Sequence, residues 1–471
     1  MESQAILGNQ PAELNITLTP PAPHARRRIV SATNRFASIS RVVHYRSMIK
    51  AWAALLFFLG ASSQPPPTAV EEFAQLQQQA HAARQSGDKQ GYLHAALRMK
   101  ALLNDAPDAV EATAEAYAEA GELSPALGAL NQFVDLGQID DRLLTGKDKG
   151  FAALHGHPEY QQVLARMARN RTPVSIAQTA FTLPDPGLLA EDIDYDPQSK
   201  SFLITSVLEK KIIRAFPDGK AADFAPSPSH WPIVALKLDS ARNRVWATEV
   251  AMNGYAFAPQ SDWGRSALLC FNLHTGALLR RIEGPPHAAL GDTALTPSGD
   301  PIVSDGDGGG VYRLQGDRLI EVDGNDFISP QTPAPLPDGH RAFVPDYVRG
   351  IGLLDLTTHH VTWLDYGHEF KAALNAVDGL YLDRRSLILT QNGTSPERVI
   401  RLQLDPALTQ VVSQQIIEQA TPTLHDPTHG VIVGDSFYYI ANSGWDVLDE
   451  HGNLAPDSKL TPARVMVFHL R

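Results

Sequence analysis

The chain has 471 residues, more than one ordinary hydrophobic core accommodates, so we expect two or more domains. Its net charge is −12 at pH 7, and the basic residues are scattered rather than gathered in one stripe, which argues against a nucleic-acid partner. Cys270 is the only cysteine, which excludes an internal disulfide and a cysteine-based zinc knuckle.

The first part of the chain, residues 1–66, has the composition of a leader. Within it, Met48-Ile-Lys is followed by an apolar run, residues 51–61, that is too short to span a bilayer, and then by a polar, proline-rich break. This order predicts a signal peptide at about residues 48–63, with translation starting at Met48. A buried helix is the alternative, but the run lacks an amphipathic period. The sequence thus predicts a periplasmic or secreted protein with no stable membrane span after signal cleavage.

Residues 67–172 are rich in Ala, Leu and Gln, and their apolar residues recur at helical spacing. Gly87 and Gly121 lie 34 residues apart, and small residues at Ala114 and Ala126 flank the second glycine as in a tetratricopeptide repeat. We therefore expect a small all-α, tetratricopeptide-like domain. Such repeats bind a peptide or protein, or pack against a neighbouring domain, and both roles remain open.

Beyond residue 172 the helical periodicity disappears, and residues 173–471 show short β-branched or aromatic runs separated by turns. An acidic or polar residue, an apolar strand, a tight turn and a second apolar strand recur at intervals of roughly 40 to 50 residues. The copies begin near Glu191, Val234, Gly291, Gln331, Asp378 and His429. Because four short strands at this period are typical of a propeller, the sequence predicts an all-β, six-bladed propeller behind the helical domain.

The closure of the ring can also be predicted. The last copy shows only three strands and ends with the apolar run 463–470. Its fourth strand can come from residues 174–183, which precede the first full copy. Joining both ends of the propeller in one blade would remove the strand edges that an open ring exposes.

Four segments at the strand starts carry a family resemblance. They are Glu191-Asp-Ile-Asp-Tyr-Asp-Pro197, Val377-Asp-Gly-Leu-Tyr-Leu-Asp383, residues 290–299 and residues 431–442. Over about residues 173–471 the chain resembles the regucalcin and gluconolactonase family of six-bladed propellers. The resemblance implies a divalent cation in the central channel and an activity toward small lactones or esters.

The resemblance assigns the cation to side chains at three strand starts. It implies a metal site of Glu191, Gln331 and Asp378, in which Gln331 stands where the family has an asparagine. A set of oxygen ligands of this kind suits calcium, with zinc, manganese or magnesium as alternatives. We expect Glu191 to face the cation and its neighbour Asp192 to turn away, toward a blade contact or solvent.

Substrate binding and catalysis are assigned in the same way. Gly291 stands where the family often keeps an asparagine that touches substrate, and Asp292 follows it, so this pair is the candidate substrate site. His429 is an addition to the family pattern, and as an imidazole it could act as a ligand or as a base. Asp378 and His429 are therefore the candidate catalytic residues.

Two functions remain open. The first is metal-dependent hydrolysis of a small lactone or ester, in which the cation polarises the carbonyl. The second is a noncatalytic propeller that binds a ligand or protein, with polar channel residues that hold only water. A serine or cysteine hydrolase is disfavoured because the chain has no G-x-S-x-G motif and Cys270 has no evident base. Asn392 and Asn442 are interpreted as loop caps, and the tryptophans, Trp445 among them, mostly as blade packing, with a few at the rim of the channel mouth.

Overall fold

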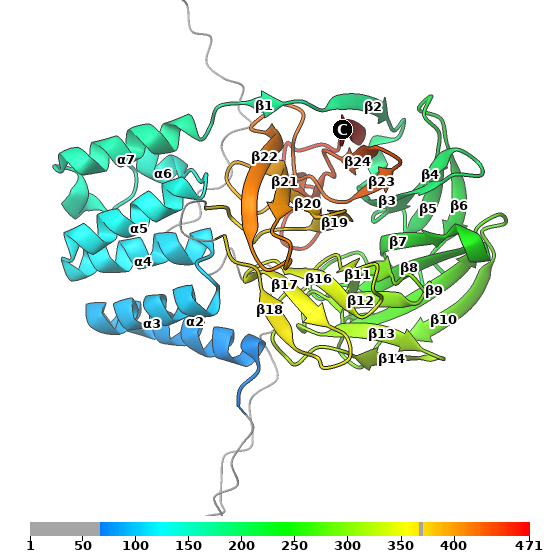
Figure 1. Ribbon diagram of the computed structural model, residues 1–471, viewed down its shortest axis with the longest axis horizontal. Coiled ribbons are helices and arrows are strands. Elements are labelled where there is room, and N and C mark those ends of the chain that lie inside the picture. The colour runs from blue at the N-terminus through cyan, green and yellow to red at the C-terminus, as the bar shows by residue number, and fades with distance from the viewer. Residues whose placement is uncertain (1–65, 367–370) are drawn as a thin grey trace, which may run out of the picture.

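The protein folds into a helical segment followed by a ring of six β-sheets (Figure 1). A computed structural model describes residues 66–366 and 371–471. The predicted combination of a small all-α region and an all-β, six-bladed propeller is confirmed. The predicted signal segment, about residues 48–63, lies outside the described residues. Among the helices described, none has both the length and the apolar character needed to cross a bilayer.

The helical segment contains two helical hairpins followed by a shorter pair of helices. The helices are α2 (Ala69–Ser86), α3 (Lys89–Leu102), α4 (Pro107–Ala120), α5 (Leu123–Asp135), α6 (Asp141–Leu144) and α7 (Pro158–Arg169). Gly87 ends α2 with φ 73°, and Gly121 ends α4 with φ 84°. Glycine adopts this left-handed conformation without the steric cost that a Cβ imposes. The two glycines that lie 34 residues apart therefore separate the helices of the two hairpins.

Each of the six sheets is one propeller blade, and the blades are numbered in the chain order of their innermost strands. Blade 1 contains β3 (Ala190–Asp196), β4 (Ser201–Ser206), β5 (Lys211–Ala215) and β6 (Ala221–Pro226). Blade 2 contains β7 (Ile233–Asp239), β8 (Arg244–Ala251), β9 (Arg265–Asn272) and β10 (Leu278–Glu283). Blade 3 contains β11 (Leu290–Leu295), β12 (Pro301–Asp305), β13 (Val311–Gln315) and β14 (Arg318–Glu321).

Blades 4 to 6 follow the same plan. Blade 4 contains β15 (Ala334–Pro335), β16 (Arg341–Asp346), β17 (Gly350–Asp355) and β18 (Val361–Trp363). Blade 5 contains β19 (Gly379–Asp383), β20 (Ser386–Gln391), β21 (Arg398–Leu404) and β22 (Val411–Gln419). Blade 6 contains β23 (Gly430–Val433), β24 (Ser436–Ile440), β25 (Arg464–His469) and β2 (Gln178–Thr182). All neighbouring strands within these blades are antiparallel.

The ring closes through blade 6, where β2 pairs with β25 and Phe181 lies opposite Val465. Apolar side chains of blades 6 and 1 then pack together across this seam, among them Phe202 and Ile440. The predicted fourth strand is therefore confirmed for the second half of residues 174–183. The first half differs, because β1 (Val174–Ser175) pairs with β22 and adds a fifth strand to blade 5. The chain passes the edge of blade 5 on its way from α7 to blade 6.

The innermost strands of the blades contact one another in order around the ring and line its central channel. In β3 the register with β4 shifts between Ala190 and Ile193, so a bulge lies at Glu191 and Asp192. The inner strands β7 and β11 have shifts at the corresponding place. Because a bulge re-aims side chains, the simple alternation of a strand does not decide where these residues point.

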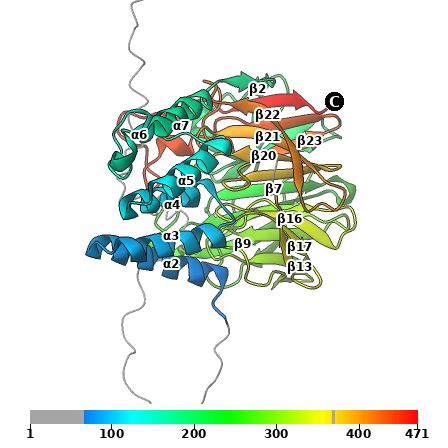
Figure 2. The same cartoon turned by 60° about the vertical axis from the view of Figure 1, so that its left-hand side comes forward.

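The helical segment packs against the face of the ring at which the inner strands of blades 4 and 5 begin (Figure 2). Ile328 and Val348 share an apolar cluster with residues of α2, α3 and α4, and Ala373 belongs to the core of α4, α5 and α7. These three residues lie in loops before β15, between β16 and β17, and before β19. The helices therefore contact the ring at blades 4 and 5, through loops on the face where the inner strands begin (Figure 1).

Candidate metal centre

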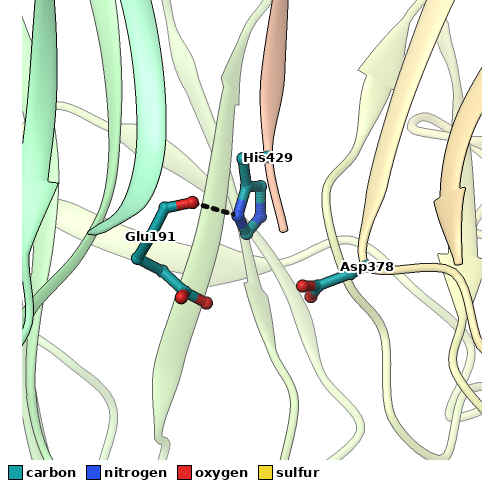
Figure 3. Close-up of side chains that lie close together, drawn as sticks. All are labelled: Glu191, Asp378 and His429. Atoms are coloured by element: carbon teal, nitrogen blue, oxygen red, sulfur yellow. Dashed lines mark hydrogen bonds between the residues drawn. The ribbon is translucent and has the colours of Figure 1, made fainter. Parts of the chain in front are cut away.

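Three titratable side chains from three consecutive blades meet at the start of the inner strands. Glu191 of blade 1, Asp378 of blade 5 and His429 of blade 6 each offer one possible ligand atom, and these atoms lie within 4.8 Å of one another. Figure 3 shows the three side chains pointing toward a common space. Residues far apart in the chain converge because ring closure makes blades 5, 6 and 1 neighbours.

Glu191 and Asp192 follow different directions from the bulge in β3. One carboxylate oxygen of Glu191 accepts a hydrogen bond from the indole N–H of Trp445, so the side chain is held at the channel. Asp192 is fully buried instead, and it accepts bonds from the backbone N–H of Leu236 (2.8 Å) and from Lys237 Nζ (2.8 Å) in blade 2. The adjacent acids therefore serve a channel site and a contact between blades.

His429 is held in one orientation by the backbone of blade 1. Its Nδ1 lies 3.0 Å from the carbonyl oxygen of Glu191 (Figure 3), and since a carbonyl only accepts, Nδ1 carries the hydrogen. Nε2 lies 3.0 Å from Oδ1 of Asp292 but has no aligned hydrogen bond. The ring is 1% exposed, and its Nε2 pairs with the Asp292 carboxylate when the ring is protonated. Histidines that bind metals are commonly oriented in this way, by an N–H bond from the other nitrogen.

Asp378 is oriented by the second strand of its own blade. The side chain of Asn392 donates to its Oδ2 over 2.9 Å, and the backbone N–H of Asp378 donates to Thr390 in β20. Burial raises the pKa of Asp378 to about 6; His429 opposes this effect and Asp292 adds to it. Burial and then the neighbouring Asp378 hold the pKa of Glu191 well above its ordinary value. Carboxylates brought together in this way are stabilised in their charged form by a cation.

The electrostatic balance around the imidazole has the same cause. Burial alone would lower the pKa of His429, but the negative charges of Asp292, Asp192 and Asp378 keep it well above its ordinary value. A positive charge is therefore favoured in the middle of this group. The donor set of two carboxylates and one imidazole fits a divalent cation, which would replace the proton on Nε2.

The remaining predicted site residues lie beside this cluster or away from it. Asp292 is buried, contacts His429, and lies with its Oδ2 2.9 Å from the hydroxyl of Thr332. Gly291 contributes a carbonyl that accepts the hydroxyl of Thr248. The amide nitrogen of Gln331 donates to the carbonyl and hydroxyl of Ser329, which turns it toward the loop before β15. The predicted ligand role of Gln331 and the predicted substrate role of Gly291 and Asp292 stay predictions.

Two residues that contact the cluster were given other roles from the sequence. Asn392 was interpreted as a loop cap, and Trp445 as blade packing, yet they bond Asp378 and Glu191. Asn392 directly follows β20, whose end lies beside the start of β19. A polar residue after the second strand of a blade that also bears a candidate ligand is the signal that could have identified it.

The opposite end of the channel has a different chemistry. A cavity of about 280 Å³ opens there, lined mainly by apolar side chains that include Leu238, Leu380 and Ile432. Glu191, Asp378 and His429 do not line this cavity. The polar cluster and the cavity therefore occupy separate parts of the channel.

Comparison with known proteins finds similar solved structures but no matching family. No protein-family model matches the chain, and no curated protein matches it. Similar solved structures include a putative oxidoreductase (glucose dehydrogenase) from Thermus thermophilus, with 14% identity and a TM-score of 0.42, covering 63% of this chain and 100% of that one. A second is a calcium-binding protein, regucalcin, from Agrobacterium tumefaciens, with 15% identity and a TM-score of 0.42, covering 62% of this chain and 96% of that one. A third is a gluconolactonase from Xanthomonas campestris, with 13% identity and a TM-score of 0.41, covering 63% of this chain and 99% of that one. The six-bladed fold that the resemblance implies is present in the six sheets of the ring.

Proposed function

We propose that Glu191, Asp378 and His429 bind a divalent cation and that the protein is a metal-dependent hydrolase of small lactones or esters. The observation that carries the proposal is the convergence of three ligand atoms from blades 1, 5 and 6 within 4.8 Å. The carboxylates supply negative charge, and because Nδ1 of His429 bonds a backbone carbonyl, Nε2 is the ring nitrogen that can bind the cation.

The donor set bears on which cation is bound. The sequence predicted oxygen ligands and therefore calcium, with zinc, manganese or magnesium as alternatives. An imidazole nitrogen beside two carboxylates favours zinc or manganese over calcium. When bound, the cation would polarise the substrate carbonyl and stabilise the negative charge that develops on its oxygen.

The protein's own side chains orient the reactants and accept a proton. Trp445 and Asn392 hold the carboxylates of Glu191 and Asp378 by hydrogen bonds. Asp378, in the charged form that the cation would stabilise, is the group that can accept a proton from an attacking water. His429, whose Nδ1 is engaged by a backbone carbonyl, serves better as a ligand than as the base.

We also propose that the protein is exported to the periplasm or secreted, on the basis of the signal-like segment at about residues 48–63. Fractionation of cells that express the full chain tests this part directly. Recovery of the protein from the cytoplasm with this segment still attached would contradict the proposed export.

The activity is tested by calorimetry with Zn²⁺, Mn²⁺ and Ca²⁺ and by hydrolysis of a panel of lactones and esters. Asp378→Asn should weaken metal binding and lower metal-stimulated turnover by at least about 100-fold, because it removes a ligand. Asp383→Asn is the matched control, since Asp383 lies at the other end of β19 and pairs with Arg401. Its metal affinity and turnover should stay within about twofold of the wild type.

The outcomes separate the two candidate functions. Metal binding without turnover of any substrate would support the noncatalytic alternative, a propeller that binds a ligand or protein. Absence of metal binding by the wild type would overturn the proposed site.

A further inference from the structure

We propose that Asn392 and Tyr347 are positioning residues that set the orientation of the Asp378 carboxylate. The inference rests on the proposed function, because Asp378 matters as a ligand of the cation. It adds two residues to the site, and one of them belongs to a blade that supplies no ligand.

The register of blade 5 brings Asn392 to Asp378. Gly379, the first residue of β19, lies opposite Thr390 near the end of β20, and the N–H of Asp378 donates to the carbonyl of Thr390. Asn392 follows two residues later, and its Nδ2 lies 2.9 Å from Oδ2 of Asp378. The contact is therefore fixed by the hairpin itself and does not depend on a long flexible side chain.

The direction of each hydrogen bond in this chain follows from chemistry. An ionised Asp378 can only accept, so Asn392 must turn its NH₂ group toward it. The carbonyl oxygen of Asn392 then faces Tyr347, whose hydroxyl donates to it over 2.9 Å. Tyr347 therefore holds Asn392 in the one orientation that supports the charged carboxylate.

Gly393 allows the tyrosine ring to approach. A Cβ at Gly393 would lie 2.3 Å from the hydroxyl oxygen of Tyr347 and 2.8 Å from Cζ, distances that real side chains do not adopt. Tyr347 comes from the loop after β16 of blade 4, so the hydrogen bonds connect two blades. The absence of a side chain at Gly393 is thus part of the arrangement.

The loop of Tyr347 is anchored on the helical segment. Val348 packs in the cluster formed by residues such as Phe73 and Leu103. Arg349 donates from Nε to the carbonyl of Leu102 (3.0 Å), and Asn104 donates to the carbonyl of Arg349 (3.0 Å). These contacts limit the motion of the loop on the side away from the site.

The loop of Asn392 is anchored on the same segment at a second place. Ile139 donates its N–H to the carbonyl of Ser395 (2.7 Å), and Ser395 donates to the side chain of Gln138 (3.2 Å). Arg398, at 1% exposure, donates to the carbonyl of Leu136 (3.3 Å). Both loops that position Asp378 are therefore held from outside by the helices.

The test measures Kd for Zn²⁺ and Mn²⁺ with the full chain. Asn392→Ala should weaken binding about 10–100-fold, and Tyr347→Phe about 3–10-fold, because partners of metal ligands have effects of this size. The double variant should match Asn392→Ala alone, since Tyr347 acts only through Asn392. Asn442→Ala is the matched control: Asn442 follows the second strand of blade 6 but bonds Thr461 and Pro462, and its Kd should be unchanged.

Crystal structures of the metal-free wild type and Asn392→Ala give a second readout. The Asp378 carboxylate should adopt a different rotamer in the variant. Equal Kd values for wild type and Asn392→Ala, additive effects in the double variant, or an unmoved carboxylate would each overturn the inference. If the wild type binds metal but hydrolyses nothing, only the proposed activity fails and the Kd values still decide. If the wild type binds no metal, the proposed cation site fails, and the position of the Asp378 carboxylate in the two crystal structures still decides whether Asn392 orients it.

Discussion

The two halves of the propeller ring share one backbone plan and differ in what their inner strands carry. Blades 5, 6 and 1 contribute Asp378, His429 and Glu191 to one cluster. At the corresponding places, blades 2 to 4 have Val234, Gly291 and Gln331. The second half instead supplies supporting groups such as Asp292, which contacts His429. A ring of similar units therefore need not place titratable groups in every blade, and three adjacent blades are enough to bring three possible ligand atoms together.

The sharpest test of this comparison replaces one residue in each half. His429→Ala should weaken Zn²⁺ binding by at least about 100-fold, because it removes the nitrogen ligand. Gln331→Ala should change the Zn²⁺ affinity by less than about threefold, since the NH₂ group of Gln331 donates to Ser329 and turns the side chain toward that loop. Calorimetry on both variants decides between them. A loss with Gln331→Ala as large as that with His429→Ala would make Gln331 a ligand, as the resemblance implies, and the division into halves would fall.

A second test concerns a buried acid in the half without ligands. Burial raises the pKa of Asp323, after β14, to about 6 from an ordinary value of 3.8. The folded state thus binds a proton that the unfolded state loses first, so the free energy of unfolding should fall as pH rises from about 4 to about 6 and then level off. The contribution is on the order of 2–3 kcal/mol.

Urea unfolding of wild type and Asp323→Asn between pH 4 and pH 7.5 measures it. The variant should be less stable at pH 4 relative to wild type than at pH 7.5, and added Zn²⁺ should not alter this difference. The two profiles running in parallel would mean that Asp323 does not titrate in this window.

The smallest effect is expected from the helical segment. Gln138→Ala removes the acceptor of the Ser395 N–H and should loosen the loop of Asn392, which weakens Zn²⁺ binding about 2–5-fold. Asn131→Ala is the control, because Asn131 bonds Leu127 and Arg166 within the helical segment. The same Kd for both variants would show that the anchoring of this loop does not reach the site.

The fold could be predicted largely because each blade repeats the same local pattern. The turn at Asp196 and Pro197, the two glycines of the helical hairpins and the return of residues 174–183 to the last blade are all visible as local signals. The pairing of β1 with blade 5 was missed, since two residues at a sheet edge have no periodicity. The bulge in β3 was missed for a related reason, because alternation of apolar residues does not show where a strand gains a residue.

The site was predictable only in part. Glu191 and Asp378 were selected by family resemblance and His429 as an unusual residue at a strand start, and the structure brings these three together. The roles of Asn392 and Trp445 depend on which blades are neighbours and on loop geometry, neither of which one sequence displays. The interpretation of Asp192 as a blade contact agrees with its bonds to blade 2.

The closure of the ring by β2 has a consequence for how the protein is made. β2 is among the first strands to leave the ribosome, yet its partner β25 is the last strand of the chain. β2 therefore stays unpaired while five blades are synthesised, and during that time its backbone edge can pair with strands of other chains. The helices that precede β2 are synthesised before any blade, so nascent chains should contain a folded helical segment while the propeller ring is still open.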